Sequence, residues 1–283
     1  MSSIIPKVPK IDWSERVARH WVQGNPSCTH FFNTISLMTP HGEKFFIDSV
    51  RNVTTKMELA FDPELSSAVE AFIVQELSHS NQHRQYNAIL QQSFGFKKII
   101  YNSEKLYRIA KRHTSALTQL GFVCGYEHCT AVLGNHLLSN QKIFSKADSR
   151  MVLLWCWHAV EEIEHKSVCF NLYQAAGGGW LRRVLCFLAV TVESIISFSV
   201  LWLYLLWKDD CLRHDTILKT VSDSARLFFG RNGVNWELLR CWWKYLSPAF
   251  HPEKNDDRQI LDSWIAANQE KLQPFHNMGK MKK

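Results

Sequence analysis

The sequence predicts an all-α protein built around a four-helix bundle, and three observations support this prediction. Apolar residues recur at helical spacing through a chain of 283 residues that is 46% hydrophobic, which is ample for a buried core. Two of the apolar helical segments carry the motif Glu-x-x-His, as Glu76 with His79 and as Glu162 with His165. The segment 93–112 between the second and third predicted helices is long enough to run back along a bundle as a crossover.

The N-terminal part predicts an arm, a short helix and then the first bundle helix. Residues 1–12 are expected to be extended, and residues 13–22 are expected to form a short helix that covers one end of the bundle. The first bundle helix is expected to begin at Thr39 and Pro40, because threonine is a favoured N-cap and proline is favoured in the first turn. This helix carries Glu43 in its first turn.

The next three bundle helices follow from their apolar spacing and their start and stop signals. The second helix is expected over 63–92, after Asp62, and the third over 115–139, with Glu127 at its centre. The fourth is expected to begin after Asp148 and to run to about residue 176, where three consecutive glycines stop it. Small residues in the third helix predict the close approach of a neighbouring helix: Gly121, Gly125 and Ala131.

The acidic and histidine side chains of these helices predict a metal centre. On the fourth helix His158, Glu162 and His165 follow the spacing i, i+4, i+7 and therefore share one face. Two Glu-x-x-His helices, together with one Glu from each of two other helices, form the inward-facing donor set of dinuclear carboxylate bundles. The candidate metal ligands are Glu43, Glu76, His79, Glu127, His158, Glu162 and His165.

Each of these residues also has a simpler interpretation. A single Glu-x-x-His occurs by chance, and an acidic residue in a first turn, such as Glu43, is favoured by the helix dipole alone. The two copies favour the metal centre, because their neighbours are apolar and four titratable groups would otherwise be buried without partners.

The roles of His83 and His158 depend on the topology of the bundle, and those of Glu161 and Glu164 on their position around the helix. If the second and fourth helices are antiparallel, His83 and His158 lie at the same end of the site. We assign His158 to metal binding and His83 to catalysis, as a proton carrier or a group that orients substrate; the alternative for His83 is an imidazole outside the ligand set. Glu161 and Glu164 fall off the stripe and are expected to face solvent or the third helix.

The C-terminal part contains an unusually apolar helix. Residues 184–207 include a single charge, Glu193, and are long enough to span a bilayer. Membrane contact, burial against the bundle and a homodimer interface all remain open interpretations. We therefore expect residues 1–176 to form the metal-binding bundle with its arm, and residues 180–283 to form a helical extension packed on it.

Composition excludes several classes of protein. The eight cysteines contain no Cys-x-x-Cys pair and mostly lie in apolar runs, which favours reduced thiols and a cytoplasmic protein, with membrane association as the alternative. The net charge is +7, but the basic residues are scattered except in the tail 279–283, so we expect no nucleic-acid partner. Signatures of zincins, serine hydrolases, P-loop proteins and dinucleotide-binding proteins are absent.

The chain resembles a bacterial family of predicted metal-dependent hydrolases, a ferritin-like group, in five segments: THFFNTISLMTPHGEKFF, QELSHSNQH, YEHCTAVL, WCWHAVEEIEHK and KYLSPAFHP. The resemblance extends over nearly the whole chain and implies a ferritin-like bundle and metal-dependent chemistry. The ligand set also resembles the three-histidine, four-carboxylate set of di-iron aryl-amine N-oxygenases.

Nitrogen and oxygen donors without a thiolate suit two iron ions, with manganese or zinc as alternatives. The function expected first is an O₂-activating di-iron enzyme that oxidises a small apolar or aromatic substrate. The alternatives are a dinuclear metal-dependent hydrolase and a metal-binding protein without catalytic activity.

Overall fold

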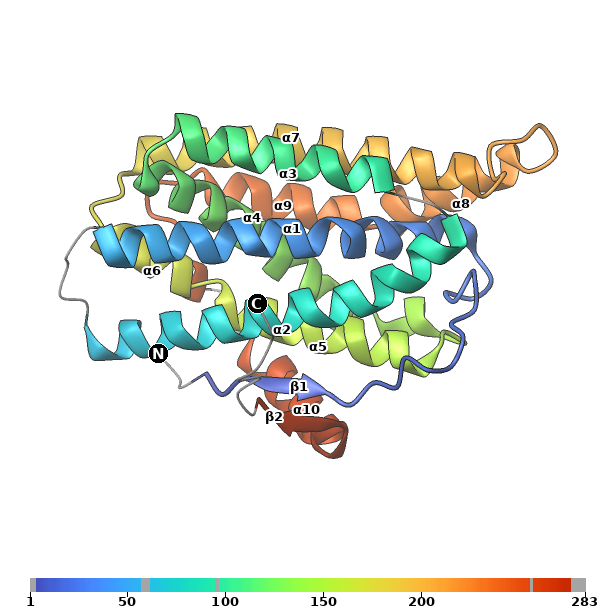
Figure 1. Ribbon diagram of the computed structural model, residues 1–283, viewed down its shortest axis with the longest axis horizontal. Helices are drawn as coiled ribbons and strands as arrows, with labels where there is room; N and C mark the ends of the chain where they lie inside the picture. Colours follow the sequence, from blue (N-terminus) through green and yellow to red (C-terminus); the bar gives the residue numbers. More distant parts are fainter. Residues whose placement is uncertain (1–3, 57–61, 95–96, 255–256, 276–283) are drawn as a thin grey trace.

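The computed structural model describes residues 4–56, 62–94, 97–254 and 257–275, and its architecture is all-α, as the sequence predicts (Figure 1). Four helices form the central bundle. α1 packs against α2 and α4, and α5 packs against the same two helices, so that every member contacts two others around one interior. Their bounds are Pro26–Lys56 for α1, Pro63–Phe94 for α2, Ala116–Ser139 for α4 and Ser149–His165 for α5.

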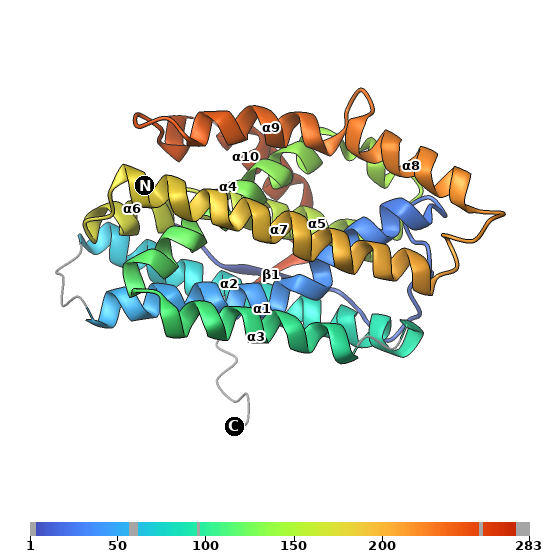
Figure 2. The ribbon, with the colours of Figure 1, turned by 90° about the horizontal axis from the view of Figure 1, so that it is seen from above.

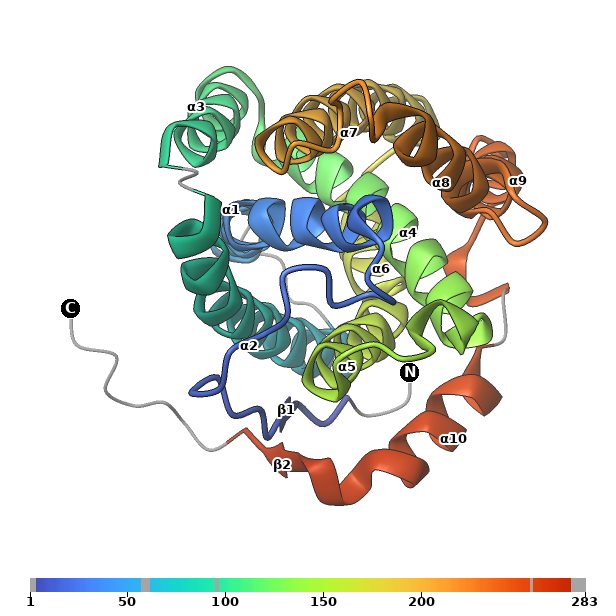
Figure 3. The same cartoon turned by 90° about the vertical axis from the view of Figure 1, so that its right-hand side faces the viewer.

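The predicted crossover is a helix, and the predicted fourth bundle helix is two helices. α3 (Lys97–His113) connects α2 to α4 in the chain and runs along the outside of α1 (Figure 3). The expectation of one helix from Asp148 to residue 176 is wrong, because α5 ends at His165 and α6 (Val168–Ala175) follows a turn. The turn lets Lys166 reach Asp257, with 2.5 Å between Nζ and Oδ2. α6 then packs between α2 and α4.

The expected start of the first bundle helix is also wrong. α1 begins at Pro26, and Pro40 lies inside it. An internal proline has no N–H to donate to the carbonyl four residues earlier, which here belongs to Ser36. The side chain of Asn87 on α2 supplies the missing donor, with 2.7 Å between Asn87 Nδ2 and the Ser36 oxygen. The tertiary contact thus satisfies the carbonyl that the proline leaves without a helical partner.

Residues 13–22 do not form the expected helix, although they do cover one end of the bundle. They are a succession of bends and turns. Trp13 donates its indole N–H to Gln82 at 3.1 Å, and Trp21 donates to the hydroxyl of Tyr86 at 2.9 Å, both on α2. A short isolated helix is marginal in water, and here these tertiary bonds decide the conformation instead.

The C-terminal helices form a second layer on one side of the bundle. α7 (Trp180–Lys208) packs on α1 and α4, α8 (Ile217–Phe229) on α1, and α9 (Val234–Tyr245) on α4 and α8 (Figure 2). α6 ends before Gly177, whose φ of +80° suits glycine, and the chain turns there into α7. The division into domains near this turn stays a prediction, and the basic tail 279–283 lies outside the described residues.

The two ends of the described chain meet on the opposite side of the molecule. β1 (Lys7–Pro9) pairs antiparallel with β2 (Leu272–Pro274), which follows α10 (Arg258–Asn268) (Figure 3). The indole N–H of Trp157 on α5 donates to the Lys7 carbonyl at 3.0 Å. The strand pair therefore forms a strap across the outer side of α5.

Close helix contacts depend on glycines of α4, as predicted for Gly121 and Gly125, which face α7. At Gly134 an added Cβ would lie 2.8 Å from the carbonyl oxygen of Ala159 on α5.

We expect Gly134→Val to lower the free energy of unfolding by about 1–3 kcal/mol, because a backbone atom cannot move aside as a side chain can. Denaturant unfolding measures this, with Ala225→Val on the exposed side of α8 as the control. An equal effect of the two changes would contradict the argument.

Candidate metal centre

The structure brings all seven candidate ligands together inside the bundle. α1 contributes one of them, α2 two, α4 one and α5 three, and every one of these residues is buried, with at most 7% of the residue exposed. Their spacing along each helix is the reason, because residues three, four and seven apart share a helix face. The seven are Glu43, Glu76, His79, Glu127, His158, Glu162 and His165.

The ligand atoms fall into two groups joined by a third. Glu43, His79 and His158 form one group, in which the donor atoms lie within 4.8 Å of one another. Glu76, Glu127 and His165 form the second, with 2.9 Å between Glu76 Oε1 and His165 Nδ1. The third consists of Glu76, His79 and Glu162 and shares one member with each of the others. This arrangement can hold two ions side by side.

Several of the nitrogen and oxygen atoms that could bind metal in this centre are buried and have no hydrogen-bond partner. They include both carboxylate oxygens of Glu76 and of Glu127, one oxygen each of Glu43 and Glu162, and Nδ1 of His79 and His165. Leaving a buried polar atom without a partner costs about 1–3 kcal/mol, and more for a charged one. Cations between these atoms would satisfy them, so the residues present fit a pair of metal ions.

His165 presents an unprotonated nitrogen to the carboxylates. Gln75 donates its amide N–H to Glu164 at 2.8 Å, so that its oxygen faces His165 Nε2 at 3.0 Å as an acceptor. Nε2 of His165 therefore carries the proton, and in the neutral ring Nδ1 keeps its lone pair. That nitrogen is the one facing Glu76 and Glu127.

A longer hydrogen-bonded chain fixes His158 in the same way. The Ser36 hydroxyl donates to Asn87 at 2.7 Å and so accepts from His83 Nδ1 at 2.8 Å. His83 Nε2 must then accept from His158 Nδ1, also at 2.8 Å. The Nε2 lone pair of His158 is left for the ion side, where Glu162 Oε1 lies 2.9 Å away. The structure thus places His83 and His158 together, as antiparallel helices require.

Glu161 belongs to this centre, contrary to the expectation that it faces solvent or the third helix. Its side chain is buried, and its Oε2 lies 3.0 Å from His79 Nε2, on the side of that ring away from the other carboxylates, although the two atoms do not have the alignment of a hydrogen bond. A carboxylate behind a ligating imidazole orients the ring and strengthens it as a ligand. The sequence did contain the signal, because Glu161 is three residues after His158 and four before His165, which places it beside both.

Burial controls the protonation of the centre when no ion is bound. It raises the pKa of Glu43, Glu76 and Glu127 well above the usual range, and the neighbouring carboxylates add to the effect. Burial also lowers the pKa of His79 and His165, which keeps both rings neutral. Because metal ligands must be deprotonated, an ion entering this centre has to displace protons from the carboxyl groups.

One cluster of possible ligands outside this centre has a different character. His20 and His30 approach the same oxygen of Asp209, with Nε2 to Oδ2 distances of 2.5 Å and 2.9 Å, and Arg19 lies 2.5 Å from the other oxygen. The carboxylate is thus paired on both oxygens without an ion. We interpret this cluster as an ionic contact that ties the C-terminal end of α7 to α1 and the N-terminal segment.

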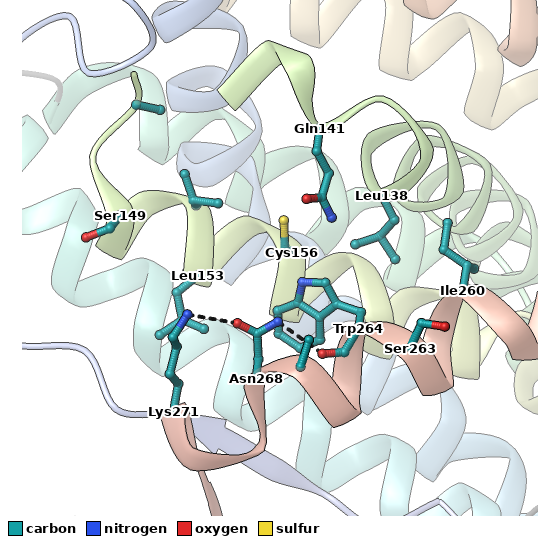
Figure 4. Close-up of a pocket in the computed structure, with 13 residues that line it drawn as sticks. Leu138, Gln141, Ser149, Leu153, Cys156, Ile260, Ser263, Trp264, Asn268 and Lys271 are labelled. Atoms are coloured by element: carbon teal, nitrogen blue, oxygen red, sulfur yellow. Dashed lines mark hydrogen bonds between the residues drawn. The ribbon is translucent and has the colours of Figure 1, made fainter. Parts of the chain in front are cut away.

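The centre is enclosed by aromatic rings and lies apart from two surface cavities. Trp157 packs against His79 and Phe72 against His165, with ring centroids 4.8 Å and 4.7 Å apart. A cavity of about 520 Å³ lies instead between α5 and α10, beside Cys156 and Trp264 (Figure 4). Another, of about 380 Å³, lies near His128 on α4. No candidate ligand lines either cavity, and the expected apolar substrate stays a prediction.

Most of the chain matches the model of a known protein family. Residues 6–256 match the family model described as predicted metal-dependent hydrolase. The chain belongs to this family. The family suggested by the sequence motifs is therefore confirmed, and the match includes all seven candidate ligands and His83. Searches of curated proteins and of solved structures gave no match.

The hydrogen bonds that join Ser36, His83 and His158 predict that substitutions of the two histidines have unequal effects on metal binding. We expect His158→Ala to lower the metal content, because it removes a ligand atom. We expect His83→Ala to keep the ions but to weaken their binding about 10–100-fold, the usual effect of removing a partner behind a ligand. Chelator competition measures both, with His136→Ala as a control outside the centre. Equal metal loss in the two variants would contradict this division.

Proposed function

We propose that this chain is a ferritin-like, dinuclear-metal hydrolase that acts on a small substrate. The main support is the convergence of three imidazole nitrogens and four carboxylates in a buried space, where many of their atoms lack other partners. Membership of the predicted metal-dependent hydrolase family supports the reaction class.

In this proposal Glu43, His79 and His158 would hold one ion, Glu127 and His165 would hold the other, and Glu76 and Glu162 would complete the ligand set. Zinc, manganese or iron would suit these nitrogen and oxygen donors. Two such ions would activate a water molecule and polarise the bond that is cleaved.

The side chains around the ions have separate tasks. Glu161 and Gln75 orient the rings of His79 and His165. His83 Nε2 can accept a proton from His158 Nδ1 while its own Nδ1–H stays bonded to Ser36, along contacts of 2.8 Å each. Trp157 and Phe72 exclude bulk water from the centre. His83 can therefore hold a proton in a site closed to bulk solvent.

A second candidate is the oxidation of a small apolar molecule with two iron ions and O₂. Its support is the resemblance of the donor set to that of di-iron N-oxygenases, together with the burial of the donor atoms, which excludes bulk water from the centre. This candidate requires a redox-active metal, whereas hydrolysis does not.

Metal exchange separates the two reactions. The metal-free protein is loaded with Zn(II) or, anaerobically, with Fe(II), and is tested against a panel of ester, amide and phosphoester substrates. Turnover with Zn(II), lost in Glu76→Ala, supports hydrolysis. Turnover that requires both Fe(II) and O₂, with an absorption change on O₂ exposure, contradicts it. Ion binding without turnover in either form supports a non-catalytic metal-binding protein.

A further inference from the structure

The outer layer formed by α7, α8 and α9 exposes an extensive apolar surface. On α7 the exposed residues recur every three or four positions, which places them along one side of the helix, facing away from the bundle. Ile195, Ile196 and Val200 each remain about 60% exposed. α8 and α9 add further large exposed side chains, among them Leu218, Phe229 and Trp243.

α7 has the length and composition of a membrane span, but its inward side is fixed to the protein. It is the one helix found to pass that test among the described residues, and 22% of its most apolar window is buried. Arg183 donates to the carbonyls of Tyr245 and Ser247, at 2.9 Å and 2.8 Å. Glu193 accepts from the hydroxyl of Tyr126 at 2.6 Å. Arg183 is therefore bonded to the end of α9 and the loop after it, and Glu193 to α4, and the helix cannot cross a bilayer without breaking these bonds.

Charged and aromatic residues surround this surface in the pattern of a membrane interface. Over residues 180–246, all of them described, nine side chains are Lys or Arg and six are Asp or Glu, a surplus of three positive charges, and eight of the nine basic side chains are exposed. Trp180 and Trp207 are exposed at the two ends of α7. Tryptophan is favoured at the boundary between lipid and water, and basic residues attract anionic headgroups.

We propose that the α7–α9 surface binds an anionic lipid bilayer, with α7 lying along the membrane plane and its exposed side chains inserted among the lipids. This is the binding mode of amphipathic helices that lie in the interface without spanning it. A second copy of the chain fits less well, because a symmetric contact brings the same positively charged rims together. The proposal is independent of the reaction at the metal centre.

Flotation with lipid vesicles tests the proposal on the full, metal-loaded chain. We expect binding to vesicles of phosphatidylcholine mixed with phosphatidylglycerol, weaker binding to phosphatidylcholine alone, and a decrease with added salt. Ile196→Glu should lower the vesicle affinity about tenfold or more, since it places a charge where the proposal inserts an apolar side chain among the lipids. The matched control is Ile5→Glu, at an exposed isoleucine of the N-terminal arm, which should bind as the unmodified chain does.

Both variants change exposed side chains, and circular dichroism with metal analysis confirms that each one is folded. Two results would overturn the proposal. One is a folded, metal-loaded chain that does not float with the anionic vesicles. The other is a stable dimer in size-exclusion chromatography that Ile196→Glu converts to a monomer, which would assign the surface to a second copy of the chain.

Discussion

Glu76→Ala is expected to remove both metal ions from the protein. Glu76 is the one carboxylate that belongs to two of the three ligand groups, and its oxygens lie near both His79 and His165. Its loss therefore opens the coordination of both ions. Elemental analysis after reconstitution should show about two ions per chain in the unmodified protein and less than about one in the variant.

The same substitution should also remove the stability that metal binding supplies. At a free metal concentration about 1,000 times the dissociation constant, a ligand that binds only the folded state contributes about 4 kcal/mol. Thermal unfolding with and without metal measures this contribution. Glu70→Ala, at an exposed glutamate of the same helix, is the matched control and should retain both ions and the stabilisation. Two ions in Glu76→Ala would contradict the proposed centre.

The metal-free protein is expected to lose stability as the pH rises above about 7. Burial raises the pKa of Glu43, Glu76 and Glu127, so the folded chain keeps protons that the unfolded chain releases near pH 4.5. A raised folded pKa gives stability that is fully present below the unfolded value and is lost as the pH rises through the folded value.

The buried histidines change the stability in the opposite direction with pH, but in a lower pH range. Burial lowers the pKa of His79 and His165, so their contribution is present above about pH 6.5 and is lost as the pH falls below it. Above about pH 7 both rings are neutral in the folded and the unfolded chain, so the carboxyl groups set the slope, and as the pH approaches 9 the buried thiols, such as Cys124 and Cys169, whose pKa burial also raises, add to it. Each proton retained by the folded state then lowers stability by about 1.4 kcal/mol per pH unit.

Denaturant unfolding from about pH 7 to pH 9, with chelator and with metal, measures this dependence. The metal-loaded protein should show a much smaller slope, because the ions bind the deprotonated carboxylates. Glu76→Gln, a neutral substitution of similar shape, should reduce the slope of the metal-free protein. A flat profile without metal would mean that the carboxyl groups are already ionised in the folded chain. Loading with metal near neutral pH should also release protons, which a pH-stat detects.

The sequence predicted those parts of the fold and of the centre that depend on local spacing. α2 and α4 begin within a residue or two of the expected positions, because apolar periodicity and the capping residues agree there. The seven candidate ligands lie together because spacing along a helix fixes the face on which a side chain lies. Metal binding by them stays a prediction.

The errors occur where a distant part of the chain decides the local structure. Thr39 and Pro40 have the composition of a helix start, yet Asn87 satisfies the carbonyl that Pro40 leaves free, and α1 continues through them. Residues 13–22 have helical composition, yet their tryptophans bond to α2. Neither partner can be identified from the segment itself, because both lie more than 40 positions away in the sequence.

The strap formed by β1 and β2 sets an order of events during biosynthesis. The Lys7 carbonyl accepts from Trp157, and the Lys7 amide N–H lies 3.5 Å from Glu161 Oε1, so the strap contacts the carboxylate behind His79. Residues 272–274 leave the ribosome only after all seven candidate ligands have done so. In the proposed centre, ions could therefore enter while that side of α5 is still uncovered. Pairing of the strands then covers the outer side of α5, and we expect metal exchange in the mature protein to require the strap to open.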